Sequence, residues 1–238
     1  MEKIEKEKVK KILEFYLSMN TLKDIPRTGW LDWSVNRDRI ESVADHVYGT
    51  QQLAYVIWSE FDVPVNIDRV LAMLAFHETE EPVIGDIPLV HDLKKYKKEM
   101  GEIAVDNLVS KLSKNTYIRN LIAEFEECKT PEAKFAKYVD KLECDLQSKI
   151  YDEEDTVDVN DQENNASSKV PLVKQLLDEG KSFGEMWMEF GRNVYNYPQE
   201  FNDVSEYAEK NNLHDMRDSN IEEAKNKVKE YLNKIKNL

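Results

Sequence analysis

The stretch LAMLAFHETEEPVIGDIP, residues 71–88, places a histidine and three glutamates directly after an apolar run. If a helix over residues 67–81 continues through them, its turn of about 100° per residue keeps His77, Glu78 and Glu81 on the buried apolar side. Burying two carboxylates is costly unless something compensates for the lost hydration. A bound cation is one such compensation, and it predicts metal chemistry at this helix end.

Two other predicted helices bring a polar group toward the interior. His46 shares a sector with the apolar residues of a helix over residues 41–61. Asp140 lies roughly 80° from the apolar face of the helix that begins at Pro131, where it can face a flanking pocket. Three apolar helices thus each carry a group of this kind, and a shared cation would explain all of them.

Each of these residues also has a simpler interpretation. A lone inward histidine is more often a hydrogen-bonded core residue than a ligand. Acids near a helix end, such as Glu78 and Glu81, are usually solvated, although they oppose the helix dipole there. Glu80 falls off the buried sector and is expected in solvent, and an aspartate beside lysines is usually a surface ion pair.

The elements that must position these residues are predicted to be helices. Only seven glycines and seven prolines occur in 238 residues, and 34% of the chain is charged, which favours an all-α protein. Helical patterns cover residues 3–19, 41–61, 67–81, two segments within 91–127, 129–151, 170–177, 183–195 and a last helix from about Asn220. Thr130 is the expected N-cap of the helix that begins at Pro131.

One domain is expected over residues 1–238, with its core in about residues 5–150. The acidic, polar segment 152–168 has almost no apolar residues and predicts an exposed, mobile loop. The residues after it, 169–238, are too few and too polar to bury a core alone. We therefore expect additional C-terminal helices that pack back onto the core.

The net charge of −14 argues against a nucleic-acid polymer as the partner, but it does not exclude a small phosphorylated substrate. Cys128 and Cys144 have no CxxC spacing and are expected to be free thiols in a reducing cytoplasm. The charged, amphipathic start is unlike a signal peptide, and the longest apolar runs are too short to cross a bilayer. A cytoplasmic protein without a membrane partner is expected.

The polar residues also resemble a known pattern. His46, the pair His77–Glu78 and Asp140 are similar to the spaced H…HD…D pattern of the HD-domain metal-dependent phosphohydrolases. The flanking ESVADH, HETEEPVIGDIP and KYVDKLE look like the branch that contains the 5′-deoxynucleotidases, and RTGW looks like its substrate-binding loop. The resemblance covers roughly residues 5–150 and implies an HD-domain helical bundle.

Carried over by position, the resemblance implies one divalent ion, with Mn, Co, Mg, Fe, Ni and Zn not distinguished. Its ligands would be His46, His77, Glu78 and Asp140. Glu81 would position or deprotonate the attacking water, and Asp86 would be the second acid of the pocket. The residues expected to contact substrate are Arg27, Trp30, Arg39 and Lys141.

The implied reaction removes the 5′-phosphate from a (deoxy)nucleoside monophosphate, or another small phosphate ester, with metal-activated water. A homodimer is plausible from the resemblance and the aromatic-rich helices. One departure is that Glu78 stands where the pattern has aspartate, which lengthens the side chain by one methylene. Two alternatives stay open: a weakly active or non-catalytic metal- or nucleotide-binding protein, and a helical interaction protein whose polar residues form a satisfied network.

Overall fold

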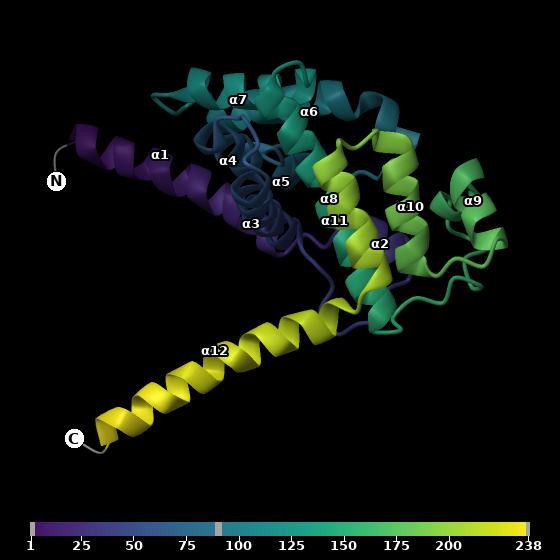
Figure 1. Ribbon diagram of the computed structural model, residues 1–238. Helices are drawn as coiled ribbons and strands as arrows, with labels where there is room; N and C mark the ends of the chain where they lie inside the picture. Colours follow the sequence, from purple (N-terminus) through teal and green to yellow (C-terminus); the bar gives the residue numbers. More distant parts are fainter. Residues whose placement is uncertain (1–2, 89–91, 237–238) are drawn as a thin grey trace.

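The computed structural model describes residues 3–88 and 92–236, and the regular elements in these ranges are helices (Figure 1). The only extended pairing among them is one isolated bridge between Pro26 and Ser42. The first half contains α1 (Lys3–Asn20), η1 (Thr21–Lys23), α2 (Thr28–Asp32), α3 (Val43–Phe61), α4 (Ile67–Phe76), α5 (Glu81–Ile84), η2 (Asp92–Tyr96), α6 (Lys97–Val109) and α7 (Asn115–Glu127). The second half contains α8 (Pro131–Glu153), η3 (Ser167–Lys169), α9 (Pro171–Asp178), α10 (Phe183–Tyr195), α11 (Gln199–Lys210) and α12 (Leu213–Lys236). The expected all-α class is confirmed.

Helix α8 is the central element, because α3, α4, α7, α10 and α11 all pack against it. It begins as predicted, with Pro131 at its first position and the Thr130 hydroxyl accepting the Ala133 N–H at 3.1 Å. Val139 and Leu142 on α8 are fully buried with Val70 and Leu74 of α4. This apolar cluster fixes α3, α4 and α8 relative to one another, and with them the polar residues that they carry.

Helix α3 starts with a capping box that sets where His46 lies. The Ser42 hydroxyl accepts the Asp45 N–H at 3.2 Å, and the Asp45 carboxylate accepts the Ser42 N–H at 2.9 Å. The His46 N–H then donates to the Ser42 carbonyl at 3.1 Å. This cap fixes where α3 begins, and the helical turn then directs the His46 ring into the protein interior.

The helix predicted over residues 67–81 is wrong in one respect. Helix α4 ends at Phe76, residues 77–80 form a turn, and α5 begins at Glu81. Pro82 explains the break, because it lacks an N–H and its ring would collide with the carbonyl four residues earlier in a continuous helix. The Thr79 hydroxyl donates to the Phe76 carbonyl at 2.7 Å, which satisfies part of the helix end.

The polar segment after α8 was expected to be exposed, and this is wrong for Gln162 and Asn165, which are buried. The Gln162 side-chain amide donates to the Trp33 carbonyl at 3.2 Å, and Asn165 donates to the Gln162 side chain at 2.9 Å. The segment therefore packs against the N-terminal part of the chain through polar contacts. Hydropathy alone did not show this.

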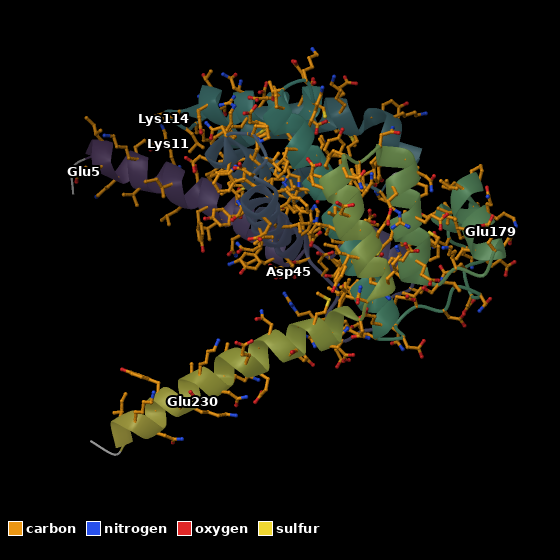
Figure 2. All side chains as sticks on the ribbon, in the orientation of Figure 1. Glu5, Lys11, Asp45, Lys114, Glu179 and Glu230 are labelled. Carbon is orange, nitrogen blue, oxygen red and sulfur yellow. The ribbon has the colours of Figure 1, made fainter. Side chains whose placement is uncertain are left out.

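The C-terminal helices divide into a packed group and an unpacked one. Helices α9, α10 and α11 lie on the body of the protein, whereas α12 projects from it (Figure 1). The backbone N–H groups of Leu213 and His214 donate to Glu153, but the residues from Asp215 to Ile235 are exposed. Figure 2 shows Glu230 on this projecting part. The prediction that the whole of 169–238 packs on the core is therefore wrong for α12, whose large apolar side chains are exposed.

Apolar residues of α1 are also left uncovered by the described residues. Ile4, Ile12, Tyr16 and Leu17 on α1 are all more than half exposed. No helix within residues 3–88 and 92–236 combines the length and apolar character needed to cross a membrane.

Candidate metal centre and substrate cavity

Four predicted ligands meet between α3, the α4–α5 turn and α8. One donor atom from each of His46, His77, Glu78 and Asp140 lies within 4.8 Å of the others. His46 Nε2 is 3.1 Å from Asp140 Oδ1 and 3.4 Å from His77 Nε2. His77 Nε2 is 3.5 Å from Glu78 Oε1. The turn at residues 77–80 thus places His77 and Glu78 in the cluster, as the predicted continuous helix was expected to do.

Each histidine ring has an oxygen beside its Nδ1. His77 Nδ1 is 2.7 Å from the Leu74 carbonyl, and His46 Nδ1 is 2.5 Å from Glu143 Oε2. With the hydrogen on Nδ1 directed at that oxygen, each neutral ring would have Nε2 free to bind a metal ion in the cluster. A carboxylate or carbonyl behind a histidine is the usual support for a metal ligand.

A divalent ion fits this donor set. Two imidazole nitrogens and two carboxylate oxygens suit transition metals, and bonds of about 2.0–2.2 Å require donors as close together as these are. The extra methylene of Glu78 leaves its Oε1 inside the cluster, 3.9 Å from His46 Nε2. The His-Glu pair is therefore compatible with the same kind of site as His-Asp.

The charges of the cluster are balanced by nearby cations. Burial alone would raise the pKa of Asp140, but Lys141 and His46 hold it well below its usual range. Lys141 Nζ is 3.0 Å from Asp140 Oδ2. Glu78 is shifted in the same direction against the effect of burial, since His77, Lys97 and Arg27 favour its charged form and lower its pKa. Both carboxylates are therefore ionised and ready to bind a cation.

Glu81 lies beside the cluster and is almost completely buried. Lys97 Nζ is 3.3 Å from its Oε1, whereas Oε2 has no hydrogen-bond partner among the described residues. Burial, together with the carboxylates of Glu78 and Asp86, raises the pKa of Glu81 to about 9. This side chain can therefore hold a proton next to the cluster, and its free oxygen can accept a hydrogen bond from a water molecule.

Arg27, Trp30 and Asp86 form one side of the site. Arg27 NH1 is 3.6 Å from Glu78 Oε1, and its NH2 donates to the Cys144 sulfur at 3.2 Å. The Asp86 carboxylate accepts the Thr28 N–H at 2.7 Å, so it fixes the loop that carries Arg27. The Trp30 indole donates to Glu41 at 2.6 Å. Asp86 thus borders the site with one oxygen already used by the backbone.

A cavity of about 200 Å³ extends from the cluster toward α10. Arg27, Lys97 and Lys141 line its polar end, beside Glu78 and Asp140. Trp33, Trp187 and Tyr195 line the other end, which we call the aromatic end. A second cavity, of about 590 Å³, also borders Asp140 and is lined by charged residues such as Lys98, Glu102 and Asp106.

Of the predicted substrate contacts, Arg39 is the one that the structure places elsewhere. Its guanidinium is exposed and forms a bidentate pair with Asp45, with both distances 2.7 Å. Arg27, Trp30 and Lys141 all line the cavity. Glu80, which was expected in solvent, is half-buried and lies against Gly101, and burial raises its pKa to about 7.

Sequence reasoning missed Glu143 and Lys97. Glu143 is three residues after Asp140 on α8, so helical spacing could have placed it near His46. The Glu143 carboxylate lies so close to Gly49 of α3 that a Cβ at that position would overlap it. Lys97 stands in the lysine-rich run KKYKK, and nothing in that run distinguishes one lysine from another.

Comparisons with known proteins agree with this geometry. The family model of the HD domain matches residues 19–177. A 5′-deoxynucleotidase of Xenopus laevis is 34% identical over 147 residues, which are 60% of this chain and 71% of that protein. One from Schizosaccharomyces pombe is 32% identical over 148 residues, covering 59% of this chain and 72% of that protein.

A solved structure shows the same fold. An HD-domain phosphohydrolase of Listeria innocua superposes with a TM-score of 0.58 at 21% identity and covers 86% of this chain and 89% of its own. Because the family model spans more than half of the sequence and includes all four residues of the cluster, the assignment does not depend on a single motif. The chain belongs to the HD-domain family.

Proposed function

We propose that the protein is a metal-dependent phosphohydrolase that removes the 5′-phosphate from deoxynucleoside monophosphates. The observation that carries this proposal is the cluster of His46, His77, Glu78 and Asp140 at the polar end of an aromatic-lined cavity. Two relatives described above are 5′-deoxynucleotidases, which supports the same substrate class for this chain. The smaller cavity suits the nucleoside because its far wall is aromatic, whereas the larger one is lined mainly by charges.

The chemistry follows from the positions of the residues. A divalent ion bound by the four ligands would neutralise phosphate charge and acidify a bound water. The charge of such an ion would lower the pKa of Glu81, which as a carboxylate would orient the attacking water through its free oxygen and take up its proton. The water oxygen bonds to phosphorus, the bond to the 5′-oxygen breaks, and a proton returns to that oxygen. Arg27 and Lys141 stabilise the charge on the phosphate oxygens.

Two features argue against the alternatives. Glu78 keeps its carboxylate among the other ligands, which argues against a site that lost its metal through the His-Glu pair. Glu81 Oε2 is buried without a hydrogen-bond partner among the described residues, which is unlike a satisfied structural network. Both features instead suit a site that binds an ion and a water.

The cellular compartment, the oligomeric state and the domain organisation are also proposals. Cys128 and Cys144 are free thiols, which supports a reducing compartment such as the cytoplasm. Sedimentation velocity at several concentrations tests the expected homodimer. The single-domain organisation, with its core in about residues 5–150, predicts one cooperative unfolding transition.

The function is tested with a panel of nucleoside 5′-monophosphates, each assayed for phosphate release with several divalent metals. We expect metal-dependent hydrolysis of deoxynucleotides. Glu81→Gln should lower kcat by roughly 10²- to 10⁴-fold while leaving metal content unchanged. Glu127→Gln, on the exposed end of α7, is the matched control. A metal-loaded wild-type protein that releases no phosphate from any nucleotide would overturn the proposal.

A further inference from the structure

Asp145 is a buried acid on the cavity wall to which the proposed reaction gives no role. It lies on α8, five residues after the ligand Asp140, and is 4% exposed. Its position borders the same cavity as Trp33, Trp187 and Tyr195. A carboxyl group in such surroundings is costly to bury, and acids of this kind are concentrated at functional sites.

The carboxyl group is held with one oxygen available. The Tyr197 hydroxyl donates to Asp145 Oδ2 at 2.8 Å, and no described residue forms a hydrogen bond with Oδ1. A Cβ on Gly191 of α10 would overlap the carboxyl group, so the glycine makes room for it. The site is therefore built around Asp145, with an acceptor oxygen left for a ligand.

The surrounding aromatic end comes partly from outside the matched family region. Trp187 and Tyr195 belong to α10, whereas the match to the HD-domain model ends at residue 177. The Trp33 and Trp187 rings lie edge to face, with centroids 6.0 Å apart. Flat aromatic walls of this kind stack on planar ligand groups. This end of the cavity is thus a feature of this chain beyond what the family model describes.

The distance along α8 fits a nucleotide. Five residues advance a helix by about 7.5 Å and turn it by about 140°, and Asp140 and Asp145 both line the same cavity at these two heights. In a nucleoside monophosphate the sugar and then the base follow the phosphate. A nucleotide with its phosphate at the cluster therefore extends its base toward Asp145 and the aromatic end.

Resting on the proposed function, we propose that Asp145 accepts a hydrogen bond from an exocyclic amino group of the nucleobase. Carboxylates recognise amino groups on base edges, such as N4 of cytosine, and repel the carbonyl oxygen that uracil and thymine carry there. The enzyme then prefers cytosine and adenine nucleotides, which carry an amino group at this edge, to those of uracil, thymine and hypoxanthine, which carry a carbonyl oxygen there.

Burial favours the neutral form of Asp145 in the free protein, and a hydrogen-bond donor on a bound base would favour the ionised form. Burial raises the pKa of Asp145 well above its usual range, while the Tyr197 hydroxyl and the Lys141 ammonium oppose that shift. A donor from the base acts in the same direction as the Tyr197 hydroxyl. It therefore favours the carboxylate in the complex.

The test compares kcat/KM for two pairs of substrates that carry either an amino group or a carbonyl oxygen at the same edge of the base, dCMP with dUMP and dAMP with dIMP. Wild-type enzyme should prefer the amino member of each pair by about ten-fold or more. Asp145→Asn, which places a donor in the same volume, should reduce that preference to about three-fold or invert it. Asp152→Asn, on the same helix but outside the cavity, is the matched control and should keep the wild-type preference.

A base-free substrate separates the possible failures. Hydrolysis of 2-deoxyribose 5-phosphate should be the same in wild type and Asp145→Asn, because it has no base to contact. Equal wild-type rates within each nucleotide pair would overturn the inference while leaving the phosphohydrolase intact. So would an Asp145→Asn variant that slows every substrate equally. Absence of phosphate release from all substrates would instead reject the proposed function.

Discussion

The two ends of the cavity are built in different ways. At the polar end, His46, His77, Glu78 and Asp140 are held within a few ångströms of one another by partners on all sides. At the aromatic end, the walls are rings that pack by shape, and Asp145 has a single hydrogen-bonded side-chain partner. Helix α8 contributes to both ends. This difference indicates that substitutions at the polar end should change the hydrolysis step. Substitutions at the aromatic end should instead change which nucleoside is preferred.

The largest effect should come from removing a ligand at the polar end. His77→Ala should lower kcat at least about a thousand-fold for every nucleotide, because the ion and its water are lost together. Metal content measured by mass spectrometry should fall in parallel. His214→Ala, which removes a histidine from the start of α12, is the control and should keep both metal and activity. A metal-loaded, active His77→Ala protein would contradict the assignment of the ligand.

A smaller effect on activity is expected from a residue that supports a metal ligand without binding the metal itself. Glu143→Gln removes the charge that holds the His46 tautomer and should weaken metal affinity by about 10- to 100-fold. Activity should recover at high metal concentration, and base preference should not change. Glu132→Gln, in the first turn of α8, where its half-buried side chain accepts the Asn66 N–H, serves as the comparison. Unchanged metal affinity would show that Glu143 does not orient His46.

Glu41 lies behind the metal cluster, where it accepts the Trp30 indole hydrogen and lies near His46. Burial and the neighbouring Glu143 raise its pKa from 4.5 to about 7. An acid with a raised pKa in the folded state stabilises it below pH 4.5 and loses that contribution as the pH rises through 7. The Glu41→Gln variant has no carboxyl group at this position, so its stability does not fall in this way.

Wild-type stability should therefore fall relative to Glu41→Gln between about pH 4.5 and 7, by roughly 1–3 kcal/mol. Urea unfolding of both proteins at several pH values measures the difference. Parallel curves over this range would show that the pKa of Glu41 is not raised in the folded protein.

The smallest effect is expected from shortening α12. Removing residues 218–238 should leave kcat/KM within about two-fold and the melting temperature within a few degrees, since this part buries almost nothing. A large loss of activity would show that the aromatic end depends on α12 as well as on α10.

The polar end could be predicted from the sequence, because histidines and acids at helical spacing are uncommon inside apolar patterns. His46, His77 and Asp140 meet as expected, although the turn before Pro82 replaces the continuous helix. The aromatic end could not be predicted in the same way. Trp187 reaches the cavity only because α10 packs on α8, which is a tertiary contact without a local signal. The same holds for α12, whose apolar residues resemble those of packed helices but remain exposed.

Two glycines described above have a consequence for engineering. Gly49 and Gly191 lie inside α3 and α10, where glycine is roughly 0.5–1 kcal/mol less favourable than alanine. Replacing helix glycines with alanine is a routine way to raise thermal stability. Here each replacement would displace a carboxyl group, Glu143 in one case and Asp145 in the other. The fold therefore gives up stability at both positions, and variants selected only for heat resistance should lose metal affinity or base preference first.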